Sequence, residues 1–302
     1  MKVLRVIVSR NVSLFFKDKG MLFTSLITPL ILLVLYATFL ADVYRDAFLA
    51  AMPIVRPLSD ALSRAVDGCV GGQLLSSLLA VSCITVAFCC NLLSVQDKVT
   101  GARRDLTVAP VQPTLLALSY YVSTALVGWM VCLVALVAGL AYLATVGFYL
   151  SLVDVLLLLL DVLLLVLLGT ALSSIVTHFL SSQGQMSAVG TIVSSGYGFI
   201  CGAYMPISSF GKGLQTVLSF LPGTYATALL RNHAMRGAMA EMQALGVPAD
   251  AIDAMGRAVD YHLKFFDHAV SPAAMLAVLC GSVIVLTLVF LAIHFKHKKS
   301  VH

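Results

Sequence analysis

Six long apolar segments constrain what this chain can fold into more than any other feature of the sequence. A helix that spans the hydrocarbon layer of a bilayer needs about 20 mainly apolar residues. Segments of this kind lie at residues 21–41, 71–95, 116–143, 152–176, 186–204 and 273–295. With 60% hydrophobic and 11% charged residues, the 302-residue chain has more apolar side chain than a water-soluble protein of this size can bury. The sequence therefore predicts an all-α integral membrane protein with six transmembrane helices.

The distribution of Lys and Arg predicts which side of the membrane each connecting segment faces. Six spans place both termini on one side, and cytoplasmic segments carry an excess of Lys and Arg. If the termini are cytoplasmic, the inner segments are clearly positive and the outer segments are close to neutral. We therefore expect cytoplasmic termini, a cytoplasmic loop at residues 96–115 and a basic cytoplasmic tail at residues 296–302. The basic residues form no dense patch, so we expect no nucleic acid partner.

Residues 1–19 have the pattern of an amphipathic helix that lies at the membrane surface. Apolar residues recur every three or four positions from Leu4 to Phe15, whereas Lys2 and Arg5 fall on another face. Cations in this position attract anionic headgroups, so membrane lipid is an expected neighbour. The same pattern also fits a simple positively charged flank on the cytoplasmic side.

The six-span part of the chain, residues 20–295, includes one long segment between spans that we expect outside, residues 206–272. Its first half, from Phe210 to Tyr225, is apolar but short and interrupted by Gly and Pro, which predicts re-entrant helices before the last span. Its second half is polar, and Pro248 can start a helix there. Two pairs of opposite charges at i,i+4 spacing support a helical cap: Asp253/Arg257 and Asp260/Lys264.

Motifs for nucleotide chemistry are missing from the sequence. The one Gly-Lys pair, Gly211-Lys212, is followed by Gly213 where a phosphate-binding loop requires Ser or Thr. His294 and His297 are spaced three residues apart, but no Cys or Glu converges with them to suggest a metal site. We therefore expect no enzyme activity, no metal and no cofactor bound by this chain.

Two acidic residues fall in the fourth expected span. Asp154 and Asp161 are seven residues apart, so they share one helix face. An ionised carboxylate deep in the membrane costs about 2.5–3.5 kcal/mol on insertion scales, so Asp161 should face protein or water. It could relay a proton or cation, or it could accept a hydrogen bond from a neighbouring helix. The second interpretation is favoured, because the expected spans contain no Lys or Arg to pair with it.

Several motifs make the sequence resemble the type-2 ATP-binding-cassette (ABC) exporter permeases. Phe16-Lys-Asp-Lys-Gly, with Pro29, is similar to the family's approach to the first span. Gly101, Asp105-Leu106 and Ala109-Pro110 are similar to its coupling segment, although Gln96 and Asp97 stand where Glu is usual and Ala102-Arg103-Arg104 replaces Thr-Leu-Glu. The most specific similarity is to its C-terminal signature: Gly196…Cys201-Gly202-Ala203-Tyr204-Met205-Pro206 and Leu221-Pro222-Gly223-Thr224-Tyr225…Leu230-Arg231. Compared with short members of this family, the polar stretch at 238–268 resembles an insertion that could bear on the choice of substrate or partner.

This resemblance implies the permease subunit of an ABC exporter in a bacterial cytoplasmic (inner) membrane. The implied substrate is apolar or amphipathic, such as a drug, a lipid or a lipid-linked molecule. The implied partners are two copies of an ABC ATPase subunit, which bind the ATP and Mg, and a second permease copy or a sister permease. The resemblance assigns ATPase coupling to Gly101, Arg103, Arg104, Asp105 and Pro110. It assigns gate or signature positions to Tyr197, Phe199, Gly202, Tyr204, Met205, Pro206, Pro222 and Tyr225.

Two other functions fit the same sequence. One is an ion- or proton-coupled carrier that uses Asp161, which the absence of a visible internal repeat disfavours. The other is a non-transporting membrane scaffold or immunity protein, which would bind an ATPase without responding to nucleotide.

Overall fold

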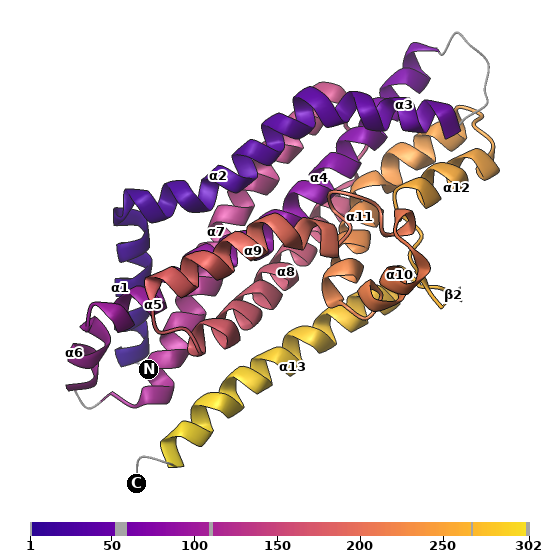
Figure 1. The fold of residues 1–302 in the computed structure, drawn as a ribbon. Coiled ribbons are helices and arrows are strands. Elements are labelled where there is room, and N and C mark those ends of the chain that lie inside the picture. The colour runs from indigo at the N-terminus through magenta and orange to yellow at the C-terminus, as the bar shows by residue number, and fades with distance from the viewer. Residues whose placement is uncertain (1, 52–58, 109–110, 267, 300–302) are drawn as a thin grey trace.

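One long helix, α4 (Asp60–Cys90), forms the centre of the fold. The computed structural model describes residues 2–51, 59–108, 111–266 and 268–299 (Figure 1). It packs α2, α7, α8, α9 and α11 against α4, so almost every α4 residue beyond Val66 is buried. The low charge of α4 suits this position, because a helix surrounded by other helices has no polar face.

In the first part of the chain, shorter helices adjoin the long helices α2 and α4 at their ends. α1 (Lys2–Lys17) meets α2 (Lys19–Leu35) at Asp18, whose side chain accepts a hydrogen bond from the Met21 amide. α2 continues through a π-helical turn, η1 (Tyr36–Leu40), into α3 (Ala41–Ala51). After α4 come two short helices, α5 (Leu92–Val99) and α6 (Ala102–Val108), which lie near α1 in Figure 1.

The second half contains three long helices and a group of shorter elements. The long helices are α7 (Pro113–Val146), α8 (Leu152–His178) and α13 (Pro272–Lys299). The elements between α8 and α13 are α9 (Gln183–Ile200), η2 (Ile207–Ser209), α10 (Lys212–Leu218), α11 (Pro222–Ala244), α12 (Ala249–Ala258), β1 (Lys264–Phe265) and β2 (His268–Ala269). β1 and β2 form a small antiparallel pair in which Lys264 lies opposite Ala269.

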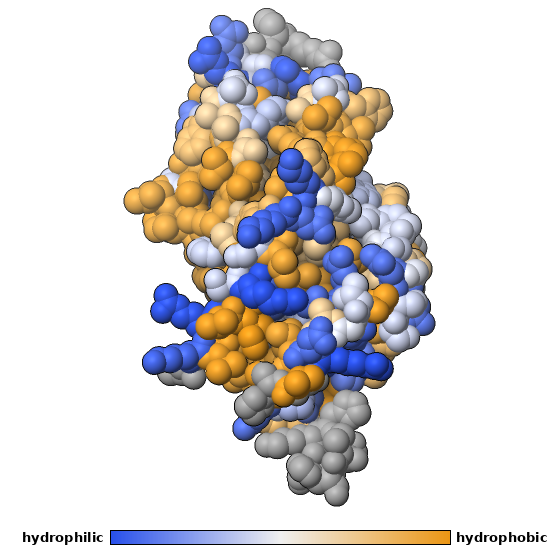
Figure 2. All heavy atoms as spheres, turned by 90° about the vertical axis from the view of Figure 1, so that its left-hand side faces the viewer, coloured by the Kyte–Doolittle hydropathy of each residue, from blue (hydrophilic) through white to orange (hydrophobic). Residues whose placement is uncertain are grey.

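Five helical segments of the described residues are long and apolar enough to cross a membrane: Lys19–Ala50, Asp60–Val99, Pro113–Val146, Leu152–His178 and Pro272–Phe295. The expected class, an all-α membrane protein, is therefore confirmed. α9 occupies the fifth expected span, residues 186–204, but is absent from this set, because its Gln, Ser and Thr side chains lower its hydropathy. The end of the molecule that carries α1, α5 and α6 presents hydrophilic residues beside apolar surface (Figure 2).

Helix α11 belongs to the packed bundle, although it comes from the segment expected outside the membrane. It packs against α4, α8 and α13. A Cβ atom at Gly72 of α4 would lie 2.5 Å from the carbonyl oxygen of Ala234 in α11, so only glycine permits this approach. α11 is therefore packed among helices that were expected to span the membrane.

The expected cap at residues 249–264 is only partly helical, and its predicted ion pairs are wrong. α12 begins after Pro248 as expected, but it ends at Ala258, so Asp260 and Lys264 do not share a helix face. Asp260 instead has a φ of 54° and accepts hydrogen bonds from the backbone amides of Ile207 and Ser208. The Asp253 carboxylate instead lies 3.6 Å from His262 Nε2.

Candidate functional site

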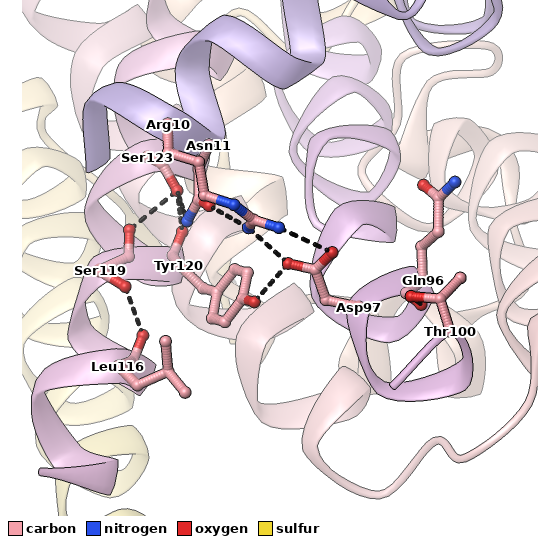
Figure 3. A network of polar contacts seen from close by, with 9 residues as sticks. All are labelled: Arg10, Asn11, Gln96, Asp97, Thr100, Leu116, Ser119, Tyr120 and Ser123. Carbon is pink, nitrogen blue, oxygen red and sulfur yellow. Dashed lines mark hydrogen bonds and ion pairs between the residues drawn. The ribbon is translucent and has the colours of Figure 1, made fainter. Parts of the chain in front are cut away.

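A buried carboxylate joins three helices at the end of the bundle that carries the expected coupling loop. Asp97 of α5 accepts hydrogen bonds from the Arg10 guanidinium of α1, at 2.6 and 3.4 Å, and from the Tyr120 hydroxyl of α7, at 2.5 Å (Figure 3). Asn11 adds a bond of 3.3 Å to the Ser123 hydroxyl. The hydrogen bond to Asp97 raises the pKa of the Arg10 guanidinium. Charge-assisted bonds of this kind hold α1 firmly against α5 and α7.

The residues predicted to contact an ATPase lie beyond this network. Gly101 separates α5 from α6 with a φ of +84°, a conformation that suits glycine. Arg104 and Asp105 of α6 are exposed. Arg103 is half-buried and lines a small pocket together with residues of α5, α7, α8 and α13. Pro110 lies outside the described residues. The role of these residues in coupling stays a prediction.

Lys98 connects the same loop to α8. Its ammonium group donates to the backbone carbonyls of Thr177, His178 and Leu180, at 2.7, 3.2 and 3.2 Å. These carbonyls belong to the C-terminal end of α8, where the helix dipole favours a cation. The loop after α4 is therefore attached to α1, α7 and α8.

A cavity of about 740 Å³ lies between α2, α9 and the end of α4 and start of α5. Its α2 wall presents Met21, Thr24 and Ile27, and its α9 wall presents Ser187 and Thr191. This volume is in the range of small-molecule sites. Hydroxyl groups among apolar side chains suit a molecule that has both apolar and polar parts.

The signature residues after α9 form a tight turn. The amides of Ala203 and Tyr204 both donate to the Gly198 carbonyl, at 2.8 and 3.0 Å, and Gly202 has a φ of +76°. Arg231 of α11, which is fully buried, donates to the Gly202 carbonyl and lies 3.9 Å from Asp260. Arg231 thus fixes the turn to α11.

The two halves of the predicted signature meet where α9 approaches the start of α11. A Cβ atom at Gly223 would lie 2.5 Å from the Tyr197 hydroxyl oxygen, so the hydroxyl occupies the space that glycine leaves open. Pro222 starts α11, and the Tyr225 hydroxyl donates to the Ser219 carbonyl at 2.6 Å.

The remaining predicted gate residues lie around the turn. The Phe199 and Tyr204 rings pack edge to face with centroids 5.2 Å apart. Phe199 and Met205 are exposed, and Pro206 is half-buried before η2. A gating role for these side chains stays a prediction.

The acidic residues of α8 have partners on α11, which corrects the expectation that Asp161 lacks a basic neighbour. The Asp161 carboxylate lies 2.5 Å from His233 Nδ1. Asp154 pairs with Arg236 and also caps α8 through Ser151. Sequence reasoning misses these partners because it places the α11 segment outside the membrane, away from any buried acid.

Sequence reasoning also missed Arg10 and Tyr120 as structural links. It included Arg231 in the C-terminal signature, but without a structural role. Asp97 carried a signal, because it is an acidic residue at a position where the coupling segment of the family usually has Glu. No comparable signal in the sequence pointed to Arg10 or Tyr120.

The fold and these sites define a membrane permease: long apolar helices, an attached loop helix at one end and a cavity between the helices. Residues 55–296 match the family described as ABC-2 family transporter protein. The chain therefore belongs to the ABC-2 transporter family, and it is an ABC transporter permease with transmembrane helices. No curated protein matches it. The amphipathic N-terminal residues lie outside the family match.

Proposed function

We propose that this chain is the permease subunit of an ABC exporter that moves an apolar or amphipathic molecule with energy from a separate ATPase. The observation that carries this proposal is the set of attachments at the coupling end. Asp97 and Lys98, adjacent residues of α5, hold α1, α7 and α8. A force applied to α5 and α6 would reach three helices at once, which mechanical coupling requires.

The substrate class follows from the cavity between α2 and α9. Its walls combine Met and Ile side chains with Thr and Ser hydroxyls, and Gln96 lines it next to the coupling loop. A drug, a lipid or a lipid-linked molecule has this mixture of apolar and polar parts. The cavity is open on one side, and a second permease copy or a sister permease would close it.

In this arrangement α9 is the fifth of six spans, shielded by the partner permease rather than by lipid. α10 and the start of α11 are the re-entrant segment, and both termini are cytoplasmic in a bacterial inner membrane. α6 meets the ATPase through Arg104 and Asp105, with two ATPase subunits for two permeases. The positive excess of the segments on the α1 side supports this orientation.

Co-purification tests the partner. The tagged chain is purified in mild detergent from its native host, and proteins recovered in stoichiometric amount are identified by mass spectrometry. We expect an ABC ATPase, and we expect to lose it when Arg103, Arg104 and Asp105 are replaced together by Ala. A matched control replaces the exposed Asp250, Asp253 and Arg257 of α12 by Ala, which should leave the ATPase bound.

Reconstitution tests the transport function. Vesicles that contain permease and ATPase should accumulate or release a labelled amphipathic probe only with ATP. If the pair moves no probe and the permease leaves ATPase activity unchanged, the export proposal is wrong.

A further inference from the structure

A small polar pocket opens where α5, α6, α7, α8 and α13 meet, apart from the cavity of the proposed substrate. Its volume is about 30 Å³, which holds water-sized groups but no acyl chain. Four of its lining residues carry basic nitrogen atoms: Lys98, Arg103, His178 and His294. None of the described residues that line it is Asp or Glu.

The acid nearest to this pocket is already neutralised. Asp97 contacts Tyr120, which lines the pocket, but its carboxylate is paired with Arg10 at 2.6 Å. The Lys98 ammonium is held by three carbonyls of the α8 end, so Lys98 contributes charge rather than a free donor. The pocket therefore keeps a positive potential.

Arg103 is the group available to bind an anion there. No hydrogen bond or ion pair joins its half-buried guanidinium to any other described residue. Guanidinium groups bind phosphate oxygens through two parallel N–H bonds. A half-buried arginine in a pocket free of carboxylates has the chemistry of a phosphate site.

Two histidines line the pocket together with Arg103. His294 Nδ1 lies 2.9 Å from the Phe290 carbonyl, so it carries the proton of that bond. His178 Nδ1 lies 3.3 Å from His294 Nε2, and the two rings pack edge to face. Both ring nitrogens of His294 are therefore engaged, so the histidines shape the polar wall of the pocket and Arg103 is the ligand for an anion.

The apolar surroundings indicate a lipid phosphate. Phe290 and Ala117 line the pocket on its apolar side. On α13, within five residues of the pocket residue Phe290, Val285, Leu288 and Val289 are each at least 41% accessible. A phospholipid could lay its chains on this surface while its headgroup oxygens enter the pocket. Basic pockets between transmembrane helices commonly bind acidic lipid headgroups.

We propose that this pocket binds the phosphate group of an anionic phospholipid, with Arg103 as its ligand. The site would connect membrane lipid to the α5–α6 loop. The proposal stands independently of the export function, because binding is measured on the permease alone.

Native mass spectrometry of the purified permease tests the site with phosphatidylglycerol, phosphatidylcholine and inorganic phosphate as probes. We expect one tightly bound phosphatidylglycerol, and about tenfold weaker binding in Arg103→Gln, since one charge-assisted contact is lost. Arg103→Lys should fall between the two. Arg104→Gln, at the exposed neighbouring position, is the matched control and should bind like the wild type.

The probes separate the sources of phosphate. Displacement of phosphatidylglycerol by millimolar inorganic phosphate, or binding of phosphate alone, would overturn the lipid assignment in favour of a site for free phosphate. Binding of phosphatidylglycerol without displacement would support a lipid site. Equal binding by wild type, Arg103→Gln and Arg104→Gln would overturn the proposal, as would equal binding of phosphatidylcholine and phosphatidylglycerol. If Arg103→Gln elutes as aggregate, Arg103→Lys replaces it, with a smaller but measurable loss expected.

Discussion

The Arg10 guanidinium lies 2.6 Å from the Asp97 carboxylate, although 87 positions separate the two residues in the chain. The family match starts at residue 55, so this ion pair attaches a helix outside the matched region to a loop inside it. Arg10 keeps 31% of its side chain accessible and Asp97 only 7%, so the acid is the buried partner. Movement of α5 must therefore carry α1 with it or break the pair.

The first prediction concerns the strength of this attachment. Arg10→Gln and Asp97→Asn should each lower the free energy of unfolding, and the double variant should lose less than the sum of the two. We expect a coupling energy of about 1–3 kcal/mol, because the bond is charge-assisted and Asp97 is buried. Titration with SDS of the protein in detergent micelles measures it.

Arg5→Gln, at an exposed position of the same helix, serves as the control and should show no coupling to Asp97→Asn. Strict additivity of Arg10→Gln and Asp97→Asn would show that the pair contributes nothing to stability.

The second prediction concerns the turn between α5 and α6. Gly101 has a φ of +84°, and no described atom lies within 4 Å of the place that a Cβ would take, so Gly101→Ala adds backbone strain without a clash. The expected cost is about 1–2 kcal/mol. Stimulation of the partner ATPase by the reconstituted permease should fall, because α6 would leave its position.

Gly184→Ala is the matched control for this variant. Gly184 lies in α9 with equally open space around it but in a helical conformation, so Ala should be neutral or slightly stabilising. If both variants behave alike in stability and in ATPase stimulation, the conformation of Gly101 does not matter for coupling.

The third prediction tests the contact between the two signature segments. Gly223→Ala places a Cβ atom 2.5 Å from the Tyr197 hydroxyl, so α9 and α11 must separate. We expect a loss of about 1–3 kcal/mol in stability, typical of overpacking, and reduced transport. Tyr197→Phe removes the clashing oxygen and leaves the ring carbon at 3.2 Å. The double variant should therefore recover part of the loss, and absence of recovery would disprove the contact.

The long helices could be predicted from the sequence because hydropathy sums the contributions of many residues. α7 and α8 begin and end within a few residues of the expected segments 116–143 and 152–176. The polar contacts could not be predicted in the same way. His233 is the partner of Asp161 only because α11 packs against α8, and spacing within one helix does not say which helix lies opposite it.

Helix ends were the other source of error. Asp260 and Lys264 have the right spacing for an ion pair, but the helix stops at Ala258 and the chain turns at Asp260. A shift of two residues at a helix end removes such a pair altogether, because the two side chains no longer share a face. The turn at Gly101 was not predicted, although glycine favours the positive φ that the turn uses: residues 96–110 were expected to form one short helix, and the structure divides the described ones between α5 and α6.

The fourth prediction decides between a structural and a transport role for Asp161. Asn keeps an oxygen that can accept a hydrogen bond from His233 Nδ1, so Asp161→Asn should retain transport with a modest loss of stability. Asp161→Leu leaves His233 buried without its partner and should cost about 1–3 kcal/mol. Asp161→Leu with His233→Leu should be more stable than Asp161→Leu alone, because replacing both partners by apolar groups removes the unpaired polar atom. Unfolding titrations and vesicle transport assays measure both effects, and an Asp161→Asn protein that is stable yet inactive would instead favour a carrier that moves protons or cations through this acid.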